Sequence, residues 1–154
     1  MPVLLLLLAA AALVYRLGTG IADRRAGEAG NGLVTWRPMT SAPGAASAAA
    51  MPVLYDFTAA WCPPCRRLDA EGWDDVAIAR RVNIEFMPVR VMDRQREDGK
   101  NTPAIDALQR KYRITSFPTL IAADGSGREL ARMEGYAGKE RLQEFLNEVR
   151  KKTR

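Results

Sequence analysis

The sequence predicts an α/β fold in which helices flank both faces of a central mixed β-sheet. From position 52 onward, short runs of β-forming residues alternate with stretches of helical periodicity, in the order β-α-β-α-β-β-α. The only two cysteines of the 154-residue chain, Cys62 and Cys65, directly follow the first of these strands. A chain of this length can bury a core without disulfide cross-links, so the close pair indicates chemistry rather than scaffolding.

The first half of the expected domain contains two strands and a long helical stretch. Residues 53–58 ("VLYDFT") are β-formers suited to the buried centre of a sheet. A helical stretch follows the cysteines to about Val82, and Gly72 marks the point where it can be interrupted. We expect a second strand at residues 84–92 and a charged loop at residues 93–101.

The second half is expected to contain a helix, a hairpin and a final helix. Thr102 can cap a helix at residues 102–112. The turn "DGSG" joins residues 119–123 and 128–134 into a hairpin of two strands. The last helix is expected at residues 138–152, with one apolar face. The residues of that face recur at i, i+3, i+4 and i+7: Leu142, Phe145, Leu146 and Val149.

The chain begins with a leucine-rich apolar segment. Residues 2–15 carry no charge but are short for a spanning helix, which needs roughly 20 apolar residues. We expect residues 1–22 to be a signal peptide or an N-terminal signal anchor, with a buried helix as the alternative. Arg16, Arg24 and Arg25 lie on the C-terminal side of the segment, and the positive-inside tendency alone would keep that side in the cytoplasm.

The stretch between this segment and the first strand is less regular. Residues 23–32 are polar and glycine-rich, as in a linker, which leaves residues 33–154 as a single domain. Residues 33–36 ("LVTW") are expected to form a short strand. A helix is expected in the second half of residues 39–51, and a flexible tether is the alternative because the segment contains a Pro–Gly pair.

Composition excludes several classes of function. The chain has no histidine, which rules out serine–histidine and cysteine–histidine catalysis. Two cysteines alone cannot build the usual four-ligand structural zinc site within one chain. The formal net charge is +5, but the one basic cluster ends the last helix, where cations also suit the helix dipole. We therefore expect no nucleic-acid partner, no bound metal and no cofactor.

The cysteine pair has the spacing and the context of a redox site. After a strand and at the start of a helix, Cys62 lies among free N–H groups and at the positive end of the dipole, which favour its thiolate. Cys65, one turn further on, stays within bonding distance and can resolve a mixed disulfide. Pro63 and Pro64 suit the first turn, where no intrahelical bond needs their missing N–H groups, and they stiffen the loop.

Other interpretations of the pair remain open. A structural disulfide is one, although so short a loop restrains the unfolded chain little. A module that binds Cu(I), or zinc shared between two chains, is another. The two cysteines could also be unpaired residues of the core. Finally, the chain could be an interaction domain that has the same fold but no catalytic activity.

Two segments resemble the thioredoxin-like family. "YDFTAAWCPPCRRL" is similar to the family's active-site segment, and "ITSFPTLI" is similar to its second signature, a loop with a cis proline against the cysteine pair. The resemblance runs from about residue 33 to residue 149. It implies the thioredoxin fold, a cis peptide bond at Pro118, and a backbone at Phe117 that is free to pair with an extended substrate.

The resemblance also implies roles for two residues near the motif. Asp56 occupies the place of a buried acid that transfers protons to and from Cys65, and an isolated buried carboxylate has a raised pKa. A solvent-facing strand acid is the alternative. Trp61 corresponds to a tryptophan that shields the site and offers a contact surface to substrates.

The chain departs from ordinary thioredoxins at several points. It has Pro63 where thioredoxins commonly have glycine, and it adds the apolar segment and the charged loop. It is more similar to the exported branch that includes the C-terminal domain of DsbD. This implies a thiol–disulfide oxidoreductase that reduces disulfides of exported proteins in the bacterial periplasm, free or anchored to the inner membrane. Its other partner would be an electron-donor thiol protein, soluble or membrane-bound. A DsbA-like dithiol oxidant is the alternative.

Overall fold

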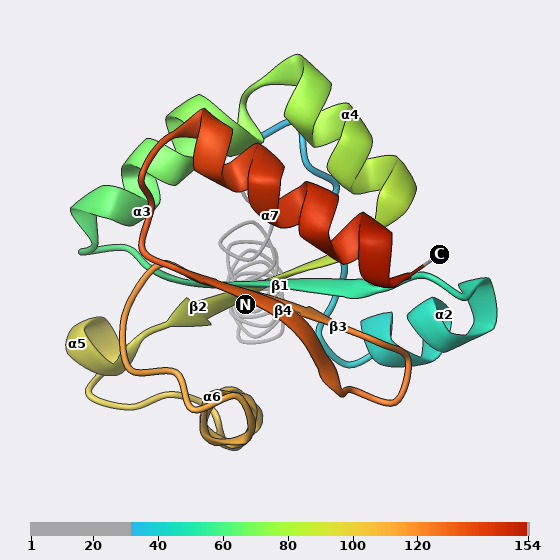
Figure 1. Cartoon of the computed structure of the whole chain (residues 1–154). Helices are drawn as coiled ribbons and strands as arrows, with labels where there is room; N and C mark the ends of the chain where they lie inside the picture. The colour runs from blue at the N-terminus through green and yellow to red at the C-terminus, as the bar shows by residue number, and fades with distance from the viewer. Residues whose placement is uncertain (1–31, 154) are drawn as a thin grey trace, which may run out of the picture. The chain divides into compact units, whose positions relative to one another are not determined.

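The computed structural model describes residues 32–153 (Figure 1). Within these residues, four strands form one mixed sheet in the order β2-β1-β3-β4. β1 runs parallel to β2 and antiparallel to β3, and β3 runs antiparallel to β4. The expected α/β fold with a central mixed sheet is confirmed. The strands are β1 (Val53–Ala59), β2 (Met87–Asp93), β3 (Thr119–Ala123) and β4 (Glu129–Glu134).

Helices cover both faces of this sheet. In Figure 1, α3, α4 and α7 lie over one face, whereas α2 and α6 lie on the other. The short helix α5 follows β2. The helical bounds are α2 (Ala42–Ala49), α3 (Pro63–Leu68), the π-helical turn η1 (Asp69–Trp73), α4 (Val76–Glu85), α5 (Gln95–Asp98), α6 (Pro103–Lys111) and α7 (Lys139–Lys152).

The central strand β1 divides the core into two clusters. All seven of its residues are buried, and alternate side chains point to opposite faces of the sheet. Leu54 packs into the cluster beneath α3, α4 and α7. Tyr55 and Phe57 pack into the cluster with α2 and α6. The alternation places Asp56 on the same face as Leu54.

The helical stretch after the cysteines is interrupted near Gly72, as expected. α3 continues into η1, which ends at Trp73, and α4 begins at Val76. A Cβ atom at Gly72 would lie 2.8 Å from Leu142 Cδ2 and 3.0 Å from Leu68 Cδ1. A larger residue at position 72 would therefore displace the Leu142 and Leu68 side chains, so glycine suits the close packing of α7 against this turn.

The expected strand at residues 33–36 is wrong. This segment has no regular strand, because the Asn83 side chain takes the backbone groups that strand pairing would use. Asn83 Oδ1 accepts from the Thr35 N–H at 2.8 Å, and Asn83 Nδ2 donates to the Leu33 carbonyl at 2.9 Å. The facing edge of β2 also contains Pro88, which has no N–H to donate.

Two boundaries after α4 also differ from expectation. The second strand begins at Met87 rather than at residue 84, because residues 84 and 85 extend α4. An ion pair one helical turn apart, Arg81 Nε to Glu85 Oε2 at 3.0 Å, stabilises that end of the helix. The expected charged loop contains the short helix α5. The cap of α6 is confirmed, because Thr102 Oγ1 accepts from the Ile105 N–H at 3.4 Å.

The expectations for the N-terminal segment fall on residues 1–22, and those for the linker on residues 23–32. Apart from Gly32, these positions lie outside the described residues. Between positions 32 and 153, no helix has the length and apolar character needed to cross a bilayer.

Candidate active site

The cysteine pair lies at the junction between β1 and α3. Cys62 is the N-cap of α3, with an extended backbone (φ −86°, ψ 109°), and its Sγ accepts from the Cys65 N–H at 3.2 Å. Pro63 and Pro64 occupy the first helical positions, where an N–H group would have no intrahelical acceptor. Cys62 and Cys65 are joined in a disulfide, so the site is in its oxidised form.

Both sulfur-bearing residues are nearly covered. Cys62 is 1% exposed and Cys65 is 2% exposed, and they pack with Ala59. The Phe117 side chain packs against this small cluster. Little of either cysteine is therefore exposed to solvent in the oxidised form.

Two aromatic side chains from separate loops border the cysteines. Trp61 is 40% exposed, and its ring meets that of Phe117 edge to face, with centroids 6.1 Å apart. The Phe117–Pro118 peptide bond is cis, and the Pro118 carbonyl accepts from the Gly135 N–H at 2.8 Å. The structure thus brings the loop before β3, the start of α3 and the end of β4 to one place.

Asp56 lies buried at the centre of a polar network that sequence reasoning did not foresee. It is 1% exposed, and its Oδ2 accepts from Trp73 Nε1 at 3.0 Å. The same oxygen lies 3.3 Å from Arg90 Nη2, and Arg90 also pairs with Asp69. The Arg90 guanidinium stacks over the Trp36 ring at 4.4 Å from its centroid.

This environment brings the ionisation of Asp56 close to neutral pH. Burial raises its pKa to about 6, against the lowering effect of the positive charge of Arg90. The negative charge of Asp69 raises the pKa further, whereas hydrogen bonds from Trp73 and Arg90 lower it. Asp56 Oδ1 is buried and has no hydrogen-bond partner among the described residues. The carboxyl group therefore keeps one free acceptor inside the protein.

The sequence marks Asp56 and Arg90 as unusual, but only the strand register shows that they lie opposite each other. Each residue is the single charged position inside an otherwise apolar run of a buried strand. The two strands pair in parallel with Asp56 opposite Arg90. Opposite charges in the middle of two neighbouring strands indicate that they meet, once the register is known.

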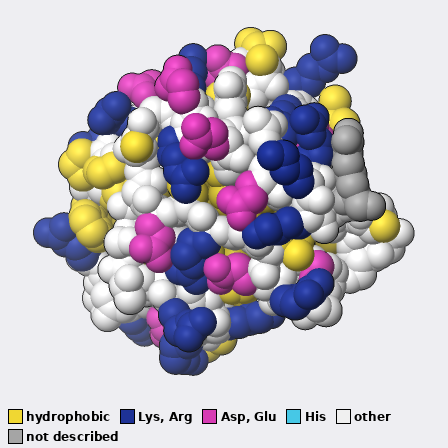
Figure 2. Space-filling view, viewed as in Figure 1, with side chains coloured by type: hydrophobic (Ala, Val, Ile, Leu, Met, Phe, Trp, Pro, Cys, Tyr) yellow, Lys and Arg dark blue, Asp and Glu magenta, His cyan; other side chains and the backbone are white. Residues whose placement is uncertain are grey.

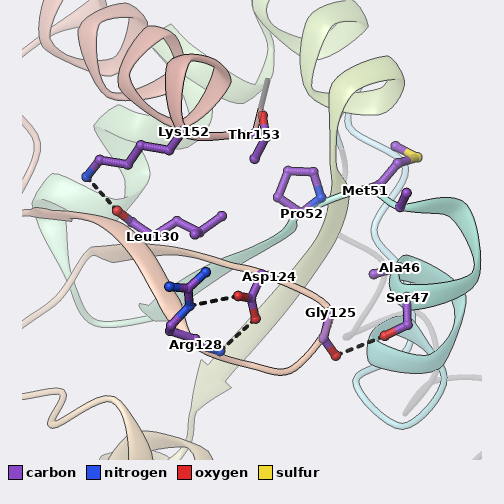
Figure 3. Close-up of a pocket in the computed structure, with 11 residues that line it drawn as sticks. Ala46, Ser47, Met51, Pro52, Asp124, Gly125, Arg128, Leu130, Lys152 and Thr153 are labelled. Carbon is purple, nitrogen blue, oxygen red and sulfur yellow. Dashed lines mark hydrogen bonds and ion pairs between the residues drawn. The ribbon is translucent and has the colours of Figure 1, made fainter.

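The surface away from the cysteines shows no comparable site among the described residues. Figure 2 shows basic and acidic side chains interspersed over the face that it presents. A pocket of about 350 Å³ lies between α2, the β3–β4 turn and the end of α7 (Figure 3). Pro52 lines this pocket just before β1, whereas the cysteines follow the other end of that strand.

The charged groups of this pocket already have partners. Arg128 Nε donates to Asp124 Oδ2 at 3.0 Å, and Lys152 Nζ donates to the Leu130 carbonyl at 2.7 Å, as Figure 3 shows. Ser47 Oγ donates to the Gly125 carbonyl at 2.9 Å. The pocket therefore lies between the end of the sheet and two helices. None of the expected site residues lines it.

Comparison with known proteins agrees with this geometry. A family model described as a thioredoxin-like domain matches residues 39–150. The chain is 33% identical over 104 residues to a thioredoxin of Alicyclobacillus acidocaldarius, covering 64% of this chain and 81% of that protein. It is 26% identical over 97 residues to the thiol:disulfide interchange protein DsbD of Pectobacterium atrosepticum. That match covers 62% of this chain but only 16% of DsbD.

A solved structure shows the same fold. The structure titled DsbH oxidoreductase superposes with a TM-score of 0.67 at 20% identity, covering 77% of this chain and 85% of that one. The family match spans the sheet, the cysteine pair and the cis-proline loop. The chain belongs to the thioredoxin-like domain family, as a thioredoxin-fold thiol–disulfide oxidoreductase whose Cys62 and Cys65 are joined in a disulfide.

Proposed function

We propose that the chain reduces disulfide bonds of exported proteins, with Cys62 as the nucleophile and Cys65 as the resolving residue. The observation that carries the proposal is the position of Cys62 Sγ at the N-terminus of α3, where it accepts the Cys65 N–H. In the reduced protein, the same N–H group and the helix dipole stabilise a Cys62 thiolate.

The exchange proceeds in two steps. The Cys62 thiolate attacks one sulfur of the substrate disulfide, a mixed disulfide forms, and the other substrate sulfur leaves as a thiolate. Cys65 then loses its proton and attacks Cys62 Sγ, which releases the second substrate thiolate. Two electrons pass to the substrate, and Cys62 and Cys65 become the disulfide. A dithiol donor protein restores the pair by the reverse exchange.

Asp56 is proposed to accept the proton of Cys65 in the second step. Its pKa of about 6 leaves it mostly ionised at neutral pH, and its Oδ1 is a free buried acceptor on the face of the sheet that α3 covers. Trp61, Phe117 and Pro118 are proposed to contact the substrate chain beside the cysteines. Phe117 packs against the pair, the Trp61 ring meets Phe117, and Pro118 follows Phe117 through the cis bond.

The direction of electron flow is tested by the reduction potential of the pair. We expect a value near −270 mV for the full chain equilibrated with glutathione buffers, as in reducing thioredoxins. The fractions of dithiol and disulfide are measured by thiol alkylation and mass shift. A value near −120 mV would instead assign the chain to the oxidants. The Cys62→Ser variant, which cannot form the disulfide, sets the baseline.

The exported location is proposed from the resemblance to the branch that includes the C-terminal domain of DsbD and from the apolar residues 2–15.

A fusion to alkaline phosphatase tests export, because this enzyme needs its own disulfides for activity. It is fused after Arg25 in a bacterial host. We expect an active fusion. A fusion that replaces three leucines of residues 4–8 by aspartate is the matched control and should be inactive. An inactive parent fusion that accumulates in the cell would contradict export.

A further inference from the structure

The loop that carries α5 is held rigidly beside the active site. At its base, Asp93 Oδ2 accepts from Asn101 Nδ2 at 2.7 Å and from Gln109 Nε2 at 2.9 Å. The Arg94 N–H donates to Asn101 Oδ1 at 2.7 Å. Asp93 and Asn101 are both buried. These bonds join the two ends of the loop to each other and to α6, so its position relative to the sheet is fixed.

One side chain of this loop reaches the active-site aromatic residues. The Arg96 guanidinium carbon lies 4.5 Å from the centroid of the Trp61 ring, a cation–π contact. The Trp61 ring in turn meets Phe117, which packs against Cys62 and Cys65. The Arg96 guanidinium group therefore contacts Trp61, Trp61 contacts Phe117, and Phe117 packs against the cysteine pair.

A second guanidinium group contacts the active-site segment from α3. Arg66, an exposed residue of α3, donates from Nη1 to the Ala60 carbonyl at 3.1 Å. Neither Arg66 nor Arg96 forms an ion pair with a described acid, whereas Arg94, on the same loop, pairs with Asp98 at 2.7 Å. Two cations without a counter-ion among the described residues thus contact Ala60 and Trp61, the two residues that directly precede Cys62.

We propose that Arg66 and Arg96 select partner proteins whose disulfide is flanked by an acidic side chain. The inference rests on the proposed disulfide exchange and adds the class of partner to it. Because both guanidinium groups are already held by contacts with the active-site segment, a partner carboxylate meets oriented donors and less side-chain freedom is lost on binding. Exposed charge pairs contribute modestly to affinity, but they raise the rate of productive encounter and disfavour partners of the wrong sign.

The test compares three synthetic disulfide peptides that differ only in the residue next to the attacked cysteine, which is Glu, Gln or Lys. The second-order rate constant for reduction by the reduced full chain is measured at low salt. We expect the order Glu, Gln, Lys, with a ratio of roughly tenfold between Glu and Lys. The ratio should shrink in about 0.5 M NaCl, where exposed charges are screened over a few ångströms.

Three variants assign the selectivity to its residues. Arg96→Gln and Arg66→Gln should each lower the Glu-to-Lys ratio, and the double variant should bring it close to one. Arg150→Gln removes the same charge from an exposed position in the last turn of α7 and should keep the wild-type ratio. A ratio near one in the wild-type chain, or an unchanged ratio in the double variant, would overturn the inference while disulfide reduction stands. Failure to reduce any of the peptides contradicts the proposed function, and the inference with it.

Discussion

The Cys62→Ser variant is expected to lose disulfide reduction by roughly 10³-fold or more, because a serine hydroxyl is not ionised near neutral pH and cannot replace the thiolate. In the structure, the Cys62 sulfur is the atom that accepts the first free N–H group of α3. The hydrogen bond and the helix dipole both favour negative charge at this position. The rate of insulin reduction by the full chain, with a dithiol reductant as the donor, measures the effect.

The Cys65→Ser variant is expected to stop the reaction at the second step rather than at the first. It keeps the attacking thiolate but cannot release the substrate, so a mixed disulfide between Cys62 and the substrate accumulates. A non-reducing gel detects this complex as a mass shift that a thiol reductant reverses. The Cys62→Ser/Cys65→Ser double variant is the control and forms no complex. If Cys62→Ser traps substrate and Cys65→Ser does not, the two roles are reversed.

The parts of the fold that sequence predicts well are those whose signal is local. The sequence predicts a strand at residues 53–58, and β1 spans Val53–Ala59, because a run of β-forming residues needs no knowledge of its neighbours. The cap at Thr102 and the hairpin turn likewise depend on a few adjacent residues. The cysteine pair belongs to the same class, since its spacing, its prolines and its place after a strand are all visible in one segment.

The parts that sequence could not predict depend on distant partners. The expected strand at residues 33–36 does not form, because the Asn83 amide bonds to the backbone there, about 50 positions away in the chain. The surroundings of Asp56 required the register of β1 on β2, which sets Arg90 opposite it. They also required the phase of the π-helical turn, which aims Trp73 Nε1 at the carboxylate. No local pattern contains either piece of information.

The contact between Arg96 and Trp61 has the same origin. The sequence marks residues 93–101 as charged and the motif as aromatic, but only the fold brings the loop after β2 to the start of α3. The hydrogen bonds of Asp93 that hold this loop join residues up to 16 positions apart. The chemistry of the site is therefore easier to predict from the sequence than its choice of partner. The reactive atoms lie in one segment, whereas the surface around them is built from several segments.

The Asp56→Asn variant is expected to change how stability depends on pH. In the folded protein, burial raises the pKa of Asp56 to about 6, whereas the carboxyl of the unfolded chain ionises near 3.8. Between about pH 4 and pH 6, the folded state holds a proton that the unfolded state has released, so stability falls as the pH rises. The shift corresponds to roughly 3 kcal/mol of stability, which is fully present below about pH 4 and is lost above about pH 6.

Asparagine does not ionise, so the variant lacks the loss of stability that the wild-type protein shows as the pH rises. Its side-chain oxygen still accepts from the Trp73 N–H. We therefore expect the free energy of unfolding of Asp56→Asn, relative to wild type, to rise by roughly 3 kcal/mol from pH 4 to pH 7. Urea unfolding of the oxidised proteins at several pH values measures it. Asp74→Asn removes an exposed acid just after the same π-helical turn and should show no comparable rise.

The network around Asp56 determines how the Asp56→Asn variant affects stability, because two carboxylates, Asp56 and Asp69, balance the charge of Arg90. Asp69, whose side chain is 42% exposed, still pairs with Arg90 when Asp56 becomes asparagine, so the guanidinium keeps a counter-ion. A difference that stays constant from pH 4 to pH 8 would mean that Asp56 ionises alike in the folded and unfolded chains. In that case the carboxyl would be held ionised by Arg90, and proton transfer with Cys65 near neutral pH would need another group.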